Sequence, residues 1–292
     1  TRVYGEANPT LTYAVAADGT GTSRGMYNSQ TLTGSVATAA IATTNVGDVS
    51  ITQNTLTNAN NANYDITYNN GTLTITPAVL TYNATAATST YGSTPSVNAG
   101  TVTGWKNSET ASTATTGTLL FSTTATGTSN VGSYAINGSG LTANHGNYTF
   151  TQAAGNATAL TINQKALTIT SDAQSTTYGT PLVLGTSGYT SSGLVNSDSI
   201  TSVTLKQGTR TTVPATQSAG TYSGSTDGIL ASAAQGTGLS NYSITYVPGT
   251  LTINQKALTI TANNNSKTYG DTLTFGSGST AFTSSGLVNS ET

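Results

Sequence analysis

The side chains that could carry out chemistry are few and scattered. The 292 residues include one histidine, His145, no cysteine, and ten aspartates and glutamates. Zinc sites rely on histidine and cysteine ligands, and a serine nucleophile needs a histidine partner. A glycosidase needs two carboxylates side by side, and the sequence groups none. We therefore expect no enzyme, no catalytic residue, no cofactor and no metal site, and we assign His145 to a turn.

One acidic position recurs along the chain. The pattern Gly-x-x-Asn-Ser is followed by Glu109, Asp198 and Glu291 in three places and by Gln30 in a fourth. Calcium is bound by clustered oxygen ligands, but Gln30 is uncharged and no second carboxylate lies nearby in the sequence. The pattern therefore favours a turn or helix-capping role for these acids over a metal site.

Aromatic residues offer a second kind of chemistry, the stacking of sugar rings. A Tyr-Gly pair occurs four times, at Tyr4, Tyr91, Tyr178 and Tyr269. The same position in every segment is typical of a buried tyrosine followed by a glycine that adopts positive φ at a turn. Trp105 stands where Leu194 and Leu287 stand in other segments, which favours a core position over an exposed sugar platform.

Composition excludes several classes of protein. Charged residues make up 6% of the chain, against about 25% in ordinary soluble domains. The net charge of −2 and the absence of a basic cluster argue against nucleic-acid partners. No apolar run approaches the ~20 residues that span a bilayer, so we expect no membrane insertion. Regularly spaced β-branched and aromatic residues argue against disorder.

The sequence repeats itself along the chain, and the residues described above recur in the same order in each repeat. Leu160–Thr170 and Leu251–Thr261 both read LTINQKALTIT. Four motifs follow one another in the same order: Tyr-Gly, Gly-x-x-Asn-Ser, a glycine before an apolar residue, and Asn-Tyr. We predict three repeats and a partial fourth, with limits at 1–77, 78–165, 166–256 and 257–292.

Each repeat reads as strands. Residues 64–68 alternate apolar and polar side chains, Asn70-Gly71 is a hairpin signal, and residues 72–76 alternate again. Residues 242–253 repeat the pattern around Pro248-Gly249. This period of two predicts half-buried strands joined in hairpins, with at most one short helix per repeat, opening at Asn196-Ser197. The linkers are short, so we expect neighbouring repeats to touch and to form a semi-rigid rod.

These motifs resemble the mostly β-grasp (MBG) domain of the Tyr-Gly-x type. The Tyr-Gly pairs, the GLVNSD and GLVNSE segments and the stretch Asn241–Ile260 carry the resemblance. It implies a mainly β fold of tandem β-grasp-like domains in an elongated array with little helix. It also implies large bacterial adhesins like filamentous haemagglutinin, exported by two-partner secretion to the cell surface for adhesion and biofilm formation. It supplies no catalytic residue.

Two functions remain open. The repeats either form a stalk that projects an adhesive region from the cell, with neighbouring repeats as their partners, or themselves bind a polysaccharide or a host surface.

The partial repeat leaves a further alternative open. Its strand Ala257–Thr261 is either poorly ordered or pairs with the first repeat of another molecule, which lacks an opening strand, to give head-to-tail chains.

Overall fold

The computed structural model describes residues 1–16, 26, 30–274, 276 and 281–292. Strands hold 42% of these described residues and helices 8%. Among the described residues the α-helices are α1 (Ala111–Ala114) and α2 (Gly224–Asp227), each four residues long. The prediction of a mainly β chain with little helix is confirmed. The chain forms two compact units, one of Thr1–Ser89, Thr94–Thr126 and Gly132–Thr161, the other of Thr90–Ser93, Gly127–Val131 and Ile162–Thr292.

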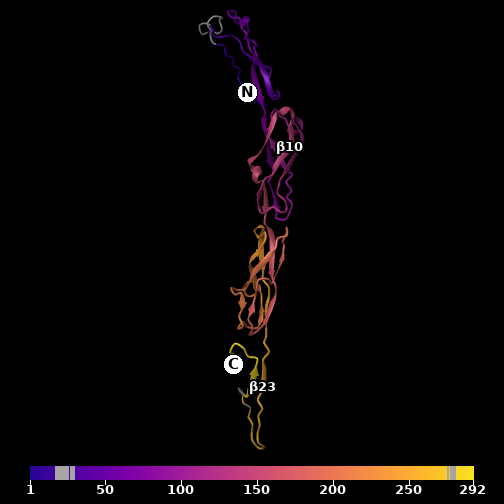
Figure 1. The fold of residues 1–292 in the computed structure, drawn as a ribbon, viewed down its shortest axis with the longest axis vertical. Coiled ribbons are helices and arrows are strands. Elements are labelled where there is room, and N and C mark those ends of the chain that lie inside the picture. The colour runs from indigo at the N-terminus through magenta and orange to yellow at the C-terminus, as the bar shows by residue number, and fades with distance from the viewer. Residues whose placement is uncertain (17–25, 27–29, 275, 277–280) are drawn as a thin grey trace. The chain divides into compact units, whose positions relative to one another are not determined.

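Strands up to residue 163 form four sheets (Figure 1). The four-stranded sheet has the order β1 (Arg2–Val3), β4 (Gly71–Thr76), β3 (Gly47–Thr52), β2 (Ala37–Thr38). One three-stranded sheet has the order β11 (Tyr148–Gln152), β5 (Ala78–Ala84), β7 (Gly100–Thr103). Another has the order β6 (Ala87–Thr90), β12 (Leu160–Asn163), β9 (Gly132–Tyr134). A ribbon pairs β8 (Thr115–Ser122) with β10 (Asn137–Ala143).

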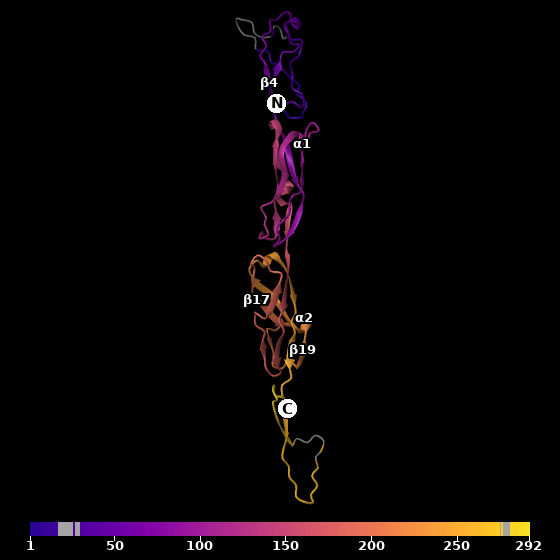
Figure 2. The ribbon, with the colours of Figure 1, turned by 90° about the vertical axis from the view of Figure 1, so that its right-hand side faces the viewer.

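Strands from residue 165 onward repeat this plan (Figure 2). The three-stranded sheets are β16 (Tyr189–Ser192), β13 (Lys165–Ser171), β21 (Tyr242–Val247) and β14 (Gln174–Thr177), β22 (Leu251–Asn254), β19 (Gly220–Tyr222). The ribbons are β17 (Ile200–Gln207) with β20 (Ile229–Gly236), β15 (Leu182–Val183) with β18 (Thr212–Val213), and β23 (Thr259–Ala262) with β24 (Phe282–Ser285). Short 3-10 turns occupy η2 (Asn58–Asn60), η3 (Asn144–Gly146), η4 (Ala154–Thr158) and η5 (Leu239–Asn241).

The core follows the predicted period of two. Leu167 and Ile169 of β13 are fully buried, and Leu251 and Ile253 of β22 are buried as well, with threonines between them on the other face. Complete burial of each such side chain contributes about 1.5–3 kcal/mol. A small number of aliphatic residues per strand therefore holds together repeats made mostly of threonine, serine and glycine.

The predicted hairpins are wrong. Residues 242–247 and 251–254 are both strands, but β21 pairs in parallel with β13, whereas β22 pairs in parallel with β14. The turn at Pro248-Gly249 carries the chain from one sheet to another instead of reversing it. In the first repeat, β4 begins at Gly71 and no strand is assigned to residues 64–68. The strand before Tyr4, β1, pairs in parallel with β4.

The predicted helix start at Asn196-Ser197 is also wrong. Both residues have left-handed φ values, 57° and 62°, which end regular structure and form a turn.

A single residue, Pro77, separates β4 from β5, and a single residue, Gln164, separates β12 from β13, so the prediction of short linkers is confirmed. The limits drawn for the repeats stay a prediction.

Candidate functional site

The recurring tyrosines and acids meet where one predicted repeat follows another. In the first compact unit, Tyr4 donates a hydrogen bond of 2.8 Å to Glu109 Oε1, and Tyr148 donates one of 2.5 Å to Glu109 Oε2. The two rings pack edge to face with centroids 5.4 Å apart. One carboxylate thus ties a tyrosine of the first repeat to a tyrosine of the second. We call this cluster the first joint.

Secondary structure sets the three side chains in place. Tyr4 directly follows β1, Tyr148 opens β11, and Glu109 lies in the turn between β7 and α1. Asn107 and Ser108, which precede Glu109, have φ values of 51° and 60°. This left-handed pair turns the chain tightly, so that the carboxylate points back toward both tyrosines.

The asparagine before Tyr148 makes a second contact across the joint. The side chain of Asn147 accepts a 2.9 Å hydrogen bond from the backbone N–H of Val46 and donates one of 2.9 Å to Asn45 Oδ1. Asn147 is buried, and a buried amide without partners costs about 1–3 kcal/mol. The Asn-Tyr motif therefore binds the preceding repeat through both of its side chains.

The glycine of the Tyr-Gly pair allows the two repeats to approach. Gly5 has a φ of 82°, and a Cβ atom on it would lie 2.3 Å from Cβ of Lys106. Its N–H donates to the carbonyl of Ala42 at 3.2 Å, and the side chain of Asn107 donates to the same carbonyl at 3.4 Å. Any side chain at Gly5 would both strain the backbone and push the repeats apart.

Apolar packing continues through the first joint. Leu73 and Ile75 of β4 share one buried cluster with Leu80 of β5, and Tyr4 and Tyr148 belong to the same cluster. The predicted limit at residue 77 therefore has no solvent layer across it, and the hydrogen bonds of the joint lie beside a continuous core.

Trp105 packs against the same cluster. Its ring lies edge to face with Tyr148 at 5.6 Å, and its Nε1–H donates to the carbonyl of Val102 at 3.0 Å. The side chain is half-buried. The interpretation of Trp105 as a packing residue fits this contact better than an exposed sugar platform does.

The second compact unit contains the same cluster again. Tyr91 and Tyr242 donate to Asp198 Oδ2 at 2.9 and 2.8 Å, with ring centroids 5.5 Å apart. Asn241 accepts from the backbone N–H of Val131 at 2.9 Å. We call this cluster the second joint.

The backbone of the second joint also matches the first. Gly92 has a φ of 86°, and a Cβ atom on it would lie 2.6 Å from Val195. The side chain of Asn196 donates to the carbonyl of Gly127 at 3.0 Å, and the N–H of Gly92 donates to that carbonyl too. The two joints therefore share hydrogen bonds, ring packing and a close glycine contact.

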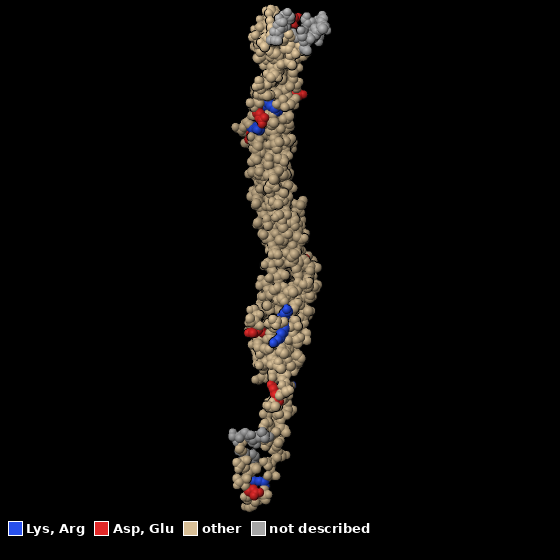
Figure 3. All heavy atoms as spheres, turned by 90° about the vertical axis from the view of Figure 1, so that its left-hand side faces the viewer, with Lys and Arg blue, Asp and Glu red and all other residues tan. Residues whose placement is uncertain are grey.

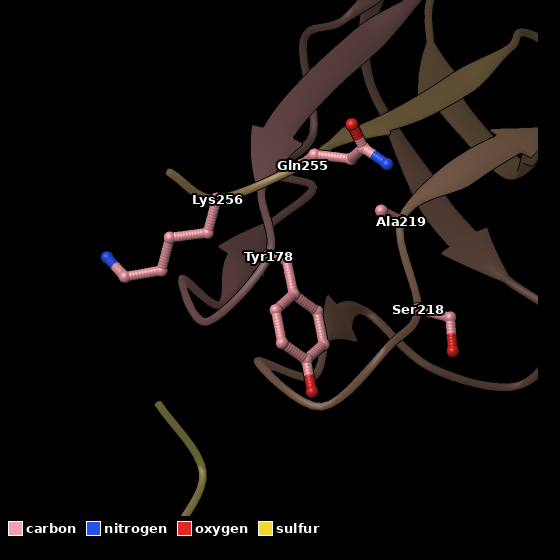
Figure 4. Close-up of a pocket in the computed structure, with 5 residues that line it drawn as sticks. All are labelled: Tyr178, Ser218, Ala219, Gln255 and Lys256. Atoms are coloured by element: carbon pink, nitrogen blue, oxygen red, sulfur yellow. The ribbon is translucent and has the colours of Figure 1, made fainter. Parts of the chain in front are cut away.

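A third copy is present in part. Tyr178 donates a 2.5 Å hydrogen bond to Glu291 Oε1, and a Cβ atom on Gly179 would lie 2.7 Å from Val288. The side chain of Asn289 donates to the carbonyl of Ala215 at 3.2 Å. No Asn-Tyr pair follows within the sequence, and Figure 4 shows side chains around an open hollow beside Tyr178. We call this cluster the third joint.

Burial raises the pKa of three tyrosines in the first two joints, Tyr4, Tyr148 and Tyr242. Burial, and then the hydrogen bond to Glu109, raise the pKa of Tyr148 and of Tyr4 above the ordinary tyrosine value. Burial chiefly raises the pKa of Tyr242 to about 12, and Asp198 contributes in the same direction. At neutral pH these three tyrosines are therefore hydrogen-bond donors to carboxylates.

The remaining candidates lie apart from the joints or in turns. His145 lies in η3 with a φ of 54°, as expected for a turn residue. Across the part of the chain that the structure describes, no three His, Cys, Asp or Glu side chains gather as a metal site would require. In the same part, no helix has the length and hydropathy to cross a membrane. Tyr269 is fully exposed and belongs to no joint.

The sequence predicted buried tyrosines and acids in turns, and Tyr4, Tyr91 and Glu109 lie in such places, whereas Tyr269 is exposed. It did not predict that the tyrosines and acids bond to each other across a repeat boundary. The nearly constant separation between the bonded tyrosine and acid was visible in the sequence. Tyr4 and Glu109 are 105 residues apart, and Tyr91 and Asp198 are 107 residues apart. Each acid therefore follows, by more than one repeat length, a Tyr-Gly pair of the preceding repeat.

Comparison with known proteins identifies the repeats. The sequence model of the MBG domain (YGX type) matches three times, over residues 1–74, 80–158 and 167–252. No curated protein and no solved structure matches the chain. The Tyr-Gly pairs that give this type its name are the pairs that form the joints. The chain belongs to the MBG domain family of the YGX type.

Proposed function

We propose that the chain is a stalk: a run of spacer repeats in a secreted or cell-surface bacterial adhesin that holds an adhesive region away from the cell. One observation carries the proposal. The same cluster of two tyrosines, one carboxylate and one buried asparagine recurs at successive repeat boundaries. A binding module needs no such device, whereas a spacer needs each repeat held firmly on the next.

The chemistry of the joints suits a spacer. Hydrogen bonds from tyrosine hydroxyls to a carboxylate are charge-assisted and directional. The buried apolar cluster beside the first joint excludes water. Linkers of one residue restrict rotation between repeats. Each joint therefore resists both bending and twisting.

The exposed surface gives less support to the alternative, in which the repeats bind a polysaccharide or a host surface. Three of the four Tyr-Gly tyrosines, Tyr4, Tyr91 and Tyr178, donate to carboxylates in the joints, so they are not free to stack on sugars. Most of the face shown in Figure 3 is uncharged. The large exposed apolar residues, such as Ile41, Leu120 and Val183, do not form a repeated patch at one position.

The stalk is tested by two measurements on the 292-residue chain. Small-angle scattering should give an elongated particle, and a Tyr4→Phe/Tyr91→Phe variant should give a broader distribution of dimensions at the same secondary-structure content. A glycan array should give no saturable binding. A compact particle, or tight binding of one glycan class, would contradict the stalk and favour the binding alternative.

A further inference from the structure

Two long segments of the third repeat run side by side in the same direction. One consists of β13 and β14, residues 165–177, and we call it the opening line. The other consists of β21 and β22, residues 242–254, and we call it the closing line. β13 pairs in parallel with β21, and β14 pairs in parallel with β22. The two lines therefore stay neighbours through two successive sheets.

The register between the lines is the same in both sheets. Lys165 lies opposite Tyr242 in the first ladder, and Gln174 lies opposite Leu251 in the second. Paired residues are therefore 77 positions apart in both ladders. If one line slid along the other by a single residue, the pairing in both sheets would be lost together.

The lines also stay in contact at the crossover between the sheets and at their far end. At the crossover, Gly249 approaches so closely that a Cβ atom on it would collide with the carbonyl oxygen of Ser171. At the far end, the N–H of Tyr178 donates to the carbonyl of Asn254 at 2.9 Å. The paired length thus has no loose segment at which separation of the lines could begin.

The same two lines carry buried apolar side chains of the repeat. Leu167 and Ile169 of the opening line are fully buried, and so are Leu251 and Ile253 of the closing line to within 3%. Separation of the lines would bring these side chains into water, which is unfavourable. The ladders and the core therefore oppose the same movement.

The chain enters and leaves the paired lines at opposite ends. It enters the opening line at Lys165 and leaves the closing line at Asn254, which lies opposite Thr177. Tension along the chain therefore pulls the two parallel lines past each other along their own axes. Single hydrogen bonds are weak, but in this geometry all the bonds of both ladders are stretched together instead of one after another.

The second repeat has the same arrangement. Its first strand, β5, pairs in parallel with β11, with Ala78 opposite Tyr148. In the next sheet the N–H of Tyr91 donates to the carbonyl of Asn163 at 2.9 Å, as the N–H of Tyr178 does to Asn254. The arrangement is therefore a property of the repeat and not of one copy.

We propose that these repeats have a mechanical function, namely to stay folded under tension applied along the chain. A repeat unfolds under such tension only when its opening and closing lines are sheared apart. The inference goes beyond a spacer, which needs only to keep its length. It stands on strand pairing inside one repeat and requires neither the joints nor the stalk, so the scattering and glycan experiments can fail without affecting it.

The test is single-molecule force spectroscopy on the full 292-residue chain, which has no cysteine of its own. Two variants receive thiol-linked handles, coupled under reducing conditions. Ala166→Cys/Asn254→Cys is pulled along the lines, and Ala166→Cys/Ser243→Cys is pulled across the ladder, since Ala166 and Ser243 lie opposite each other. All three positions are exposed. The unfolding force should be several-fold higher along the lines, because pulling across the ladder breaks one pair at a time.

The length of chain released identifies the event. The handles are 88 residues apart in the first variant and 77 apart in the second. At about 3.3–3.6 Å per residue, the stretched chain between them measures about 300 Å and about 265 Å. Events of these lengths belong to the third repeat. Equal unfolding forces in the two directions would overturn the proposal.

A matched pair of variants locates the resistance in the lines. Leu167 in β13 and Leu205 in β17 are both fully buried, but Leu205 lies outside the paired lines. Leu167→Val and Leu205→Val should lower the melting temperature by similar amounts, which shows that both variants fold. Leu167→Val alone should clearly lower the unfolding force along the lines. An equal loss of force in the two variants would contradict the assignment and overturn the proposal.

Discussion

Removal of the carboxylate from the first joint should weaken the contact between the first two repeats. Glu109→Ala leaves the hydroxyls of Tyr4 and Tyr148 without their shared acceptor. Hydrogen bonds to charged groups contribute about 1.5–3 kcal/mol each when buried. Because Glu109 is partly exposed, solvent competes for the same bonds, and we expect a loss of about 2 kcal/mol for the pair.

The chain contains its own reporter for this change. Trp105 is the only tryptophan, and its ring packs against Tyr148 in the first joint. Urea unfolding followed by tryptophan emission therefore reports on this joint and not on the second. Glu109→Ala should move the midpoint to lower urea, and Glu109→Gln should lie between it and the parent, because the amide keeps one acceptor oxygen.

A matched control is available beside the joint. Glu6 forms an exposed ion pair with Lys106 at 3.8 Å, and such pairs contribute at most about 1 kcal/mol. Glu6→Ala should therefore change the midpoint little. If Glu109→Ala were no more destabilising than Glu6→Ala, the carboxylate would not be holding the two tyrosines, and the reasoning about the joints would be refuted.

Three further predictions follow from the same geometry. Gly92→Ala should lower the melting temperature well beyond Gly155→Ala, because Gly92 has positive φ and faces Val195, whereas a Cβ on Gly155 meets nothing; equal shifts in calorimetry would contradict this. The second joint should be stable below pH 10 and lose stability as pH rises toward 12, because the folded pKa of Tyr242, about 12, exceeds the ordinary value of 10.0; absorbance at 295 nm should show late-titrating tyrosines, and a single transition near pH 10 would argue against it. A chelator should leave the melting temperature unchanged, and a drop of several degrees would reveal a structural cation.

The sequence was sufficient for the elements that depend on local pattern. Alternation of apolar residues predicted the buried faces of β4 and β22, and the repeated motifs predicted the family. The glycine after each tyrosine was predicted to adopt positive φ, and Gly5, Gly92 and Gly179 all do. These features depend on neighbouring residues, so a single sequence contains enough information to predict them.

Pairing between distant strands could not be read in the same way. Asn70-Gly71 and Pro248-Gly249 are turn signals, but a turn signal does not specify which sheet the next strand joins. β21 pairs with β13, with Tyr242 opposite Lys165, 77 residues earlier in the chain, because the opening and closing strands of a repeat share a sheet. The joints were missed for the same reason, since their partners lie more than one repeat apart.

A double-mutant cycle between Tyr91 and Asp198 tests the central claim most directly, namely that a shared carboxylate couples consecutive repeats. The free energy of unfolding would be measured for the parent, Tyr91→Phe, Asp198→Asn and the double variant. We expect a coupling energy of about 1 kcal/mol or more, because the two side chains share a 2.9 Å hydrogen bond. Effects that add to within about 0.3–0.5 kcal/mol would mean that the contact does not couple the repeats, and would contradict the account.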